Sequence, residues 1–106
     1  MQTISADAVG HAARELLVRA AVRYPKSCLE KLLFHFRRET NPAAKSVLGS
    51  ILRNIALAAE DKASLCQDTG LPVFRVGLNP GLTIRGNLEE ALTAAVARAT
   101  EDVPIR

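Results

Sequence analysis

Apolar residues recur at helical spacing in four parts of the chain. The pattern i, i+3, i+4, i+7 places side chains on one face of an α-helix. It predicts helices over residues 6–22, 27–38 and 42–60, and a last helix that opens at Gly86-Asn87. The apolar face of the first helix is expected to carry Val9, Ala12, Ala13, Leu16 and Ala20, and that of the second Leu29, Leu32, Leu33 and Phe36.

Capping residues stand at the predicted helix starts. Ser5 is a suitable N-cap for the first helix, and Asn41 precedes a proline at the first position of the third. Asn87 is followed three residues later by Glu90, an approximate capping box. Within the third helix, Gly49 indicates close helix packing, and Asn54 is placed to reach the loop that follows.

Between the last two helices the pattern changes to that of strands. Residues 71–78 contain Val73, Phe74 and Val76, residue types that favour strands, and Pro72 stands among the first positions, where a missing N–H is tolerated. Residues 79–81 are typical of a turn, and residues 82–85 read as a shorter strand that pairs back as a hairpin. The predicted fold class is α+β: three N-terminal helices, a β-hairpin and a further helix.

One stretch, residues 64–72, follows neither period. It places a thiol, an amide, a carboxylate and a hydroxyl on consecutive residues, Cys66 to Thr69, and then turns at Gly70. Loops carry chemistry more often than the elements that hold them, because a rigid scaffold can aim their polar groups. The alternative is a surface turn that merely contains a cysteine.

Composition narrows the possible functions. The chain has 106 residues, 48% of them apolar and 24% charged, as expected for one globular domain. With four aromatic residues, the core must consist of leucine, isoleucine, valine and alanine. The net charge of +3 is spread without a basic run, which argues against nucleic-acid binding, and charges interrupt every apolar window that could span a membrane.

The two cysteines form no disulfide framework of the secreted type, so a reducing cytoplasm is expected. Cys28 and His35 lie seven residues apart on one side of the second helix. About 10 Å of helix axis separates them, too far for one zinc ion without other ligands. We therefore interpret Cys28 as a small buried thiol and His35 as a partly exposed side chain.

The run from Cys66 to Gly70 resembles the signature of the class I fumarate hydratases and L-tartrate dehydratases, which are iron–sulfur hydro-lyases. The order of features is also similar: a helix bearing Asn54 with an alanine-rich end, the loop, a valine-rich segment and a Gly-Asn-Leu helix start. The closing residues 103–106 resemble the family's next motif. The likeness covers essentially all of residues 1–106 and corresponds to the N-terminal part of the alpha-type subunit or domain.

The resemblance implies roles for five residues. In that family three cysteines hold a four-iron four-sulfur (4Fe-4S) cluster, and Cys66 matches the first of them. Soft thiolates suit such clusters, and an iron without a protein ligand acts as a Lewis acid. Asp68 matches a candidate for acid–base catalysis. Gln67, Thr69 and Arg106 match positions that bind the substrate.

The match also has departures. The other two cluster cysteines are expected downstream of this span, Cys28 matches no ligand position, and Ser64 stands where the family often has proline. We therefore expect an incomplete piece of a hydro-lyase, inactive alone, whose substrate is a small dicarboxylic acid (fumarate/malate or tartrate/oxaloacetate). Its expected partner is a beta-type subunit or C-terminal domain, in an oligomer. The alternative is a catalytically inert helical interaction module that binds a partner subunit.

Overall fold

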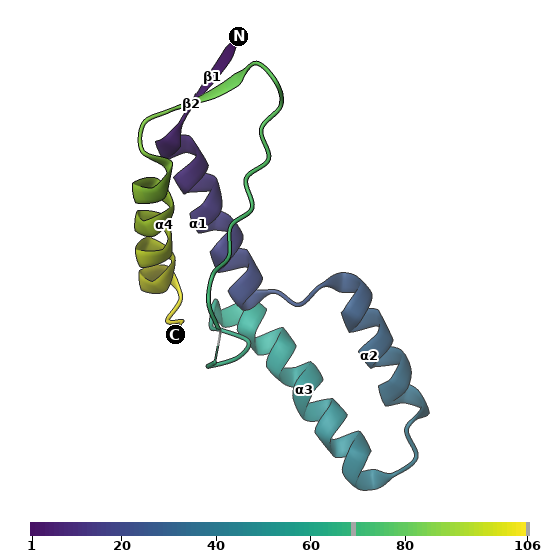
Figure 1. The fold of residues 1–106 in the computed structure, drawn as a ribbon. Coiled ribbons are helices and arrows are strands. Elements are labelled where there is room, and N and C mark those ends of the chain that lie inside the picture. The colour runs from purple at the N-terminus through teal and green to yellow at the C-terminus, as the bar shows by residue number, and fades with distance from the viewer. Residues whose placement is uncertain (69, 106) are drawn as a thin grey trace.

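The computed structural model describes residues 1–68 and 70–105. The chain forms four helices and two short strands in these residues, an α+β arrangement (Figure 1). In chain order they are β1 (Gln2–Ser5), α1 (Ala6–Val22), α2 (Lys26–Arg38), α3 (Pro42–Asp61), β2 (Leu82–Arg85) and α4 (Leu88–Asp102). The four helices predicted from periodicity are confirmed. For the three helices whose start and end were both predicted, each end differs from the prediction by at most one residue.

The predicted caps hold the helix starts. The side-chain oxygens of Ser5, Asn41 and Asn87 each accept a hydrogen bond from a backbone N–H of the first turn, at 3.0 to 3.2 Å. These bonds satisfy donors that have no partner inside the helix. The starts of α1, α3 and α4 are therefore defined by local sequence.

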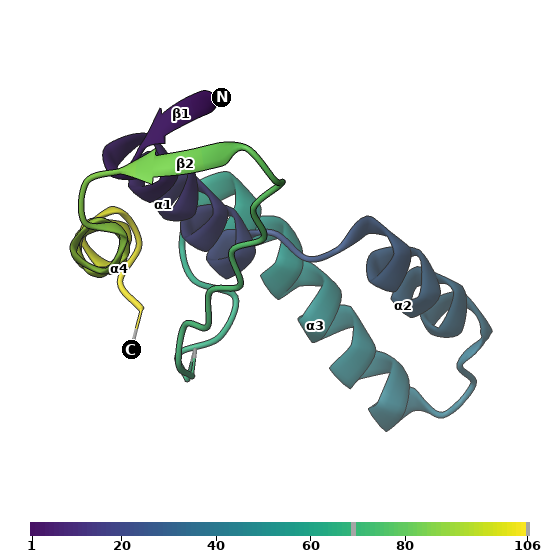
Figure 2. The same cartoon turned by 45° about the horizontal axis from the view of Figure 1, so that its top comes forward.

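The predicted hairpin is wrong. Residues 71–79, all of them described, form no strand, and β2 pairs instead with β1 in parallel, from Gln2 opposite Leu82 to Ser5 opposite Arg85. β1 leads directly into α1, and β2 leads into α4 after two residues; α1 and α4 then run side by side in the same direction (Figure 1), and Figure 2 shows the two strands lying together at their starts. Because α1 and α4 are parallel and each follows a strand, the two strands are brought together in the same direction. The packing of the helices therefore determines that β2 pairs with β1.

The contact between α1 and α4 is built from small side chains. Five small residues are buried there, and each of the four alanines is at most 5% exposed. They are Ala6, Gly10 and Ala13 of α1, and Ala95 and Ala99 of α4. A Cβ atom added at Gly10 would lie 2.9 Å from a backbone oxygen of α4. The two backbones therefore approach closely.

The apolar face predicted for α1 is correct only in part. Ala13 is buried and Val9 half-buried, whereas Leu16 is 63% exposed and Ala12 and Ala20 are exposed. The periodicity marks a wide apolar stripe, but only a narrow line of small residues fits against α4. Leu16 and two alanines of the stripe are left outside the contact.

α2 and α3 form an antiparallel arm that extends away from α1 and α4 (Figure 1). No residue of α2, all of which is described, is buried, because only one of its sides meets α3. Its apolar stripe is half-buried there, and a Cβ atom at Gly49 would lie 3.3 Å from the Phe36 ring, which confirms close packing at Gly49. The prediction of a buried Cys28 is wrong, since the thiol is on the open side and exposed, as is His35.

The arm makes the described chain long, with extents of 59 × 29 × 21 Å. Its radius of gyration is 18.1 Å, against about 13 Å for a compact domain of this size. Several large apolar residues outside the helices are exposed, among them Leu71 at 90% and Val73 at 81%. Among the helices of the described residues, we find none with the length and apolar character needed to cross a membrane.

The close approach at Gly10 can be tested against the looser one at Gly49. Gly10→Ala should destabilise the full-length protein by about 1–2 kcal/mol, because the clash with a helix backbone outweighs the gain in helix propensity. Gly49→Ala, the matched control, should be neutral or stabilising, since the Phe36 ring can shift. Thermal or denaturant unfolding measures both, and equal effects of the two substitutions would contradict the packing described.

An ion pair ties the end of α4 to α1. Arg14 donates from Nε and one terminal nitrogen to the two carboxylate oxygens of Asp102, each at 2.6 Å. A carboxylate at a helix C-terminus opposes the helix dipole, and Arg14 offsets that repulsion. Hydrogen bonding to Arg14 lowers the pKa of Asp102 below its ordinary value of 3.8.

This pKa shift predicts a pH dependence of stability. Because the pKa of Asp102 is lower in the folded than in the unfolded state, the pair stabilises the fold fully above the unfolded pKa. Its contribution is lost as the pH falls through the folded pKa. The melting temperature of Asp102→Asn should thus lie below wild type by a constant amount between about pH 5 and 7, and the gap should close below about pH 4.

The control is Glu101→Gln, which removes a neighbouring charge and leaves the bidentate pair intact. It should show a smaller gap at neutral pH. A gap for Asp102→Asn that persists unchanged at low pH would show that the ion pair is not its source.

Candidate functional site

The loop that bears Cys66 is anchored at one residue, Leu65. The backbone N–H of Leu65 donates to the carbonyl of Ala21 in α1 at 2.8 Å. The carbonyl of Leu65 accepts from the side-chain amide of Asn54 in α3 at 3.0 Å. The prediction that Asn54 reaches the loop is confirmed. The bond to Ala21 was not predicted, because backbone groups leave no signal in the sequence.

The chain enters this loop through a sharp end of α3. Lys62, directly after the helix, adopts a left-handed conformation with φ 51° and donates its N–H to the carbonyl of Ala58. The N–H of Ala63 bonds to the same carbonyl at 3.1 Å. This arrangement closes the helix and turns the chain back toward α1.

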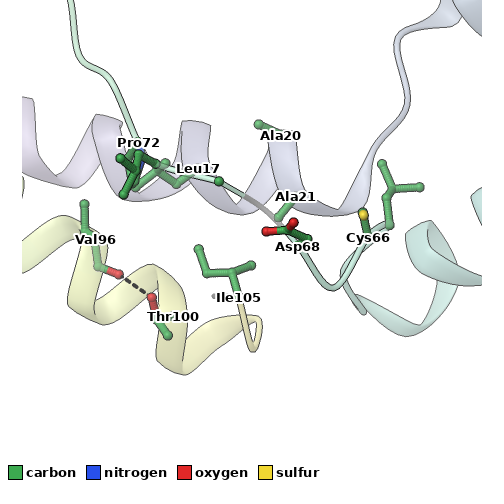
Figure 3. Close-up of a pocket in the computed structure, with 12 residues that line it drawn as sticks. Leu17, Ala20, Ala21, Cys66, Asp68, Pro72, Val96, Thr100 and Ile105 are labelled. Carbon is green, nitrogen blue, oxygen red and sulfur yellow. Dashed lines mark hydrogen bonds between the residues drawn. The ribbon is translucent and has the colours of Figure 1, made fainter.

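A cavity of about 380 Å³ lies between α1, the loop and the end of α4 (Figure 3). Cys66 and Asp68 both border it, and Figure 3 shows the sulfur of Cys66 and the carboxylate of Asp68 on the loop beside α1. The remaining wall is mostly apolar: Leu17, Ala20, Ala21, Leu65, Gly70, Leu71, Pro72, Val96, Thr100 and Ile105. The structure thus brings the predicted metal ligand and the predicted acid–base residue to one cavity.

Gln67 does not border this cavity. It lines a neighbouring one of about 540 Å³ together with Ala63, Ser64, Pro104 and Ile105. The chain bends at Gln67, and its side chain lies on a different cavity from those of Cys66 and Asp68. Ile105 borders both cavities. Thr69 and Arg106, the other predicted substrate-binding residues, lie outside the described residues.

The apolar walls that α1 and α4 contribute to the cavity were not predicted from the sequence. Val96 reads as an ordinary apolar position of the last helix, and only the packing of α4 on α1 places it on the cavity that Cys66 borders. The cavity wall that faces the loop is therefore a product of the tertiary structure.

The donor set fits one part of an iron–sulfur site. Cys66 is exposed at the cavity and offers a soft sulfur ligand, the kind such clusters use. Across the described residues, no group of three or more His, Cys, Asp or Glu side chains lies within reach of one metal ion. Cys66 by itself therefore suits the role of a single ligand, and the described residues supply no complete set of ligands around it.

Comparisons with known proteins point to one family. The family model described as "Fumarate hydratase (Fumerase)" matches residues 10–106. The chain is 32% identical over 94 residues to a protein of Methanocaldococcus jannaschii provisionally named L(+)-tartrate dehydratase subunit alpha. It is also 32% identical over 93 residues to a protein of Geobacillus stearothermophilus provisionally named fumarate hydratase class I.

Each alignment covers 87% of this chain, but only 33% of the first relative's length and 18% of the second's. The chain therefore spans a third or less of the curated relatives it matches. No solved structure gave a significant match. The family model nevertheless extends over nearly the whole chain and includes both cavity residues, Cys66 and Asp68. On this match, the chain belongs to the fumarate hydratase family.

Proposed function

We propose that this chain is a segment of an iron–sulfur hydro-lyase that adds water to, or removes it from, a small dicarboxylic acid. The observation that carries the proposal is the placement of Cys66 and Asp68 on one cavity in a chain of this family. The relatives' names, a tartrate dehydratase subunit and a fumarate hydratase, support the reaction type. Fumarate/malate and tartrate/oxaloacetate are the substrate pairs proposed.

The reaction needs a proton carrier and a site for the hydroxyl group. Hydration adds OH to one carbon of a double bond and H to the adjacent carbon, and dehydration reverses both steps. The Asp68 carboxylate takes the proton from carbon in dehydration and returns it in hydration. A 4Fe-4S cluster, when bound, supplies an open iron as a Lewis acid for the substrate's hydroxyl and carboxylate. Cys66 is one of its ligands.

The two substrate carboxylates need further partners. Arg106 is proposed to hold the carboxylate far from the iron, because a guanidinium offers two parallel hydrogen bonds to it. Thr69 is proposed to donate a hydroxyl hydrogen bond from the loop. Gln67 lines the neighbouring cavity, which shares Ile105 with the cavity of Asp68. Its proposed contact with the substrate is made in that neighbouring cavity.

The rest of the enzyme is proposed to cover the exposed apolar surfaces of this chain. Leu71 and Val73 extend into solvent at 90% and 81% exposure, an energetic cost that burial would remove. A beta-type subunit or C-terminal domain is the proposed partner, and it also contributes to the oligomer. The missing cluster ligands are proposed to lie in the part of the enzyme outside this span.

A second candidate function is an inert interaction module, which the α2–α3 arm favours. The arm extends from the rest of the described chain and exposes Phe34 at 53% and Val47 at 60%. Such a surface suits protein contacts whether or not the loop is catalytic. Anaerobic reconstitution of the full-length protein separates the two functions: about four iron per chain supports the hydro-lyase, and absence of iron uptake supports the module.

The two cysteines give a matched test of the metal site. In the full-length protein, Cys66→Ser replaces a soft thiolate by a poorly ionised hydroxyl, so iron content and hydro-lyase activity should both collapse. Cys28→Ser is the control, because Cys28 lies exposed on the arm. It should leave both properties near wild type. Equal losses in the two variants would contradict the assignment of Cys66.

The role of Asp68 is tested by removing its charge. Asp68→Asn should retain the cluster and lower turnover by about 10²–10⁴-fold, the range for loss of a positioned acid–base group. Turnover per bound cluster, with malate or tartrate as substrate, is the measurement. If Asp68 only shapes the loop, Asn replaces it well and turnover stays at the wild-type value.

A further inference from the structure

We propose that Asn54 is a positioning residue that holds Cys66 in place for metal binding, an inference that rests on the proposed function. Asn54 lies on α3, eleven residues before Leu65, whose carbonyl it contacts at 3.0 Å. It does not line the cavity of about 380 Å³ that Cys66 and Asp68 border. Its effect on the site therefore acts through the loop backbone.

Peptide geometry explains how the contact reaches Cys66. The Leu65 carbonyl belongs to the planar unit that also contains the nitrogen and Cα of Cys66. A hydrogen bond to that oxygen orients the plane from which the Cys66 side chain extends. The preceding peptide is oriented in turn by the bond from the Leu65 N–H to Ala21. Both peptide planes beside Leu65 are thus held, one by α1 and one by α3.

The residue type at position 54 points to the same role. Asparagine is a weak helix former, and an aliphatic or long side chain there would favour α3 more. What asparagine adds is a donor on a short side chain with two rotatable bonds, attached to a rigid helix. Such a donor has little conformational freedom of its own and can therefore fix the position of a loop atom. A site that holds a metal ligand in place requires support of this kind.

The neighbouring hydrogen bonds do not duplicate this contact. The N–H groups of Lys62 and Ala63 bond back to Ala58 and so fix only the start of the loop. From there to Asp68, the described backbone is without helix or strand pairing. The Asn54 contact is consequently the support nearest to the Cys66 peptide plane. Without it, the thiol would sample positions unsuited to binding a cluster.

The test removes the donor from position 54 in two chemically different ways. Asn54→Leu keeps a similar size and improves helix propensity, and Asn54→Asp keeps the shape but presents an acceptor. The matched control is Arg53→Leu, at the adjacent exposed position of α3. Three properties are measured in the full-length protein: Leu65 amide hydrogen exchange without iron, iron and sulfide retained after anaerobic reconstitution, and the melting temperature.

Both Asn54 variants should exchange the Leu65 amide about five- to tenfold faster. The Leu65 N–H keeps its own bond to Ala21, but loss of the Asn54 contact at the Leu65 carbonyl makes local opening of the loop easier by about the free energy of one hydrogen bond. Exchange in α1 and α4 and the melting temperature should stay near those of Arg53→Leu. Retained iron and sulfide should fall to less than half of wild type. A purely structural role would instead lower the melting temperature and speed exchange throughout α3.

Two results would overturn the inference: wild-type exchange and iron retention in both Asn54 variants, or the same losses in Arg53→Leu. A fall in melting temperature with general loss of protection would also overturn it. Failure of the proposed function appears differently. In that case wild type itself takes up no iron, while the Leu65 amide still exchanges faster in the Asn54 variants.

Discussion

The close approach of α1 and α4 is the constraint on which the rest of the described structure depends. Small residues along the contact, with Gly10 at its tightest point, allow the two backbones to come together. Val103, only 1% exposed, seals the end of α4 and directs the chain toward Ile105 at the cavity. The Arg14–Asp102 pair holds the same end. One wall of the candidate site is thus set by packing far from its reactive groups.

The other wall is an irregular loop, and it is ordered by polar contacts. Leu65 is bonded by its N–H to α1 and by its carbonyl to α3, so one residue connects two helices that otherwise touch little. A segment without its own hydrogen-bond ladder needs such external partners, because an unpaired backbone group is costly away from water. This arrangement lets the loop expose Cys66 and Asp68 while its base stays fixed.

Much of the described surface is unusual for a chain that folds without partners. A parallel pair of strands normally lies inside a larger sheet covered on both faces, yet β1 and β2 have no further strand beside them among the described residues. The valine-rich segment at 71–78 also has a strand-like pattern and no strand pairing. Together with the extended arm, these features are the surfaces that the proposed subunit or domain partner would cover.

The helices and their starts were determined by the sequence itself, because helical periodicity and capping depend on residues close in the chain. The Cys66 to Gly70 run likewise identified the chemical groups and the family, and Asn54 was correctly placed to reach the loop. The substrate roles of Thr69 and Arg106 lie outside what the described residues can test.

The tertiary structure alone decided which surfaces meet. Strand β2 pairs with β1, some eighty residues away, because two parallel helices bring their starts together. Leu16 and Cys28 are exposed because each helix is covered on only one side, a fact that an apolar stripe cannot reveal. Gln67 is separated from Asp68 for the same kind of reason: the two residues share a motif, but they lie on either side of a bend and face different cavities once helices pack around the loop.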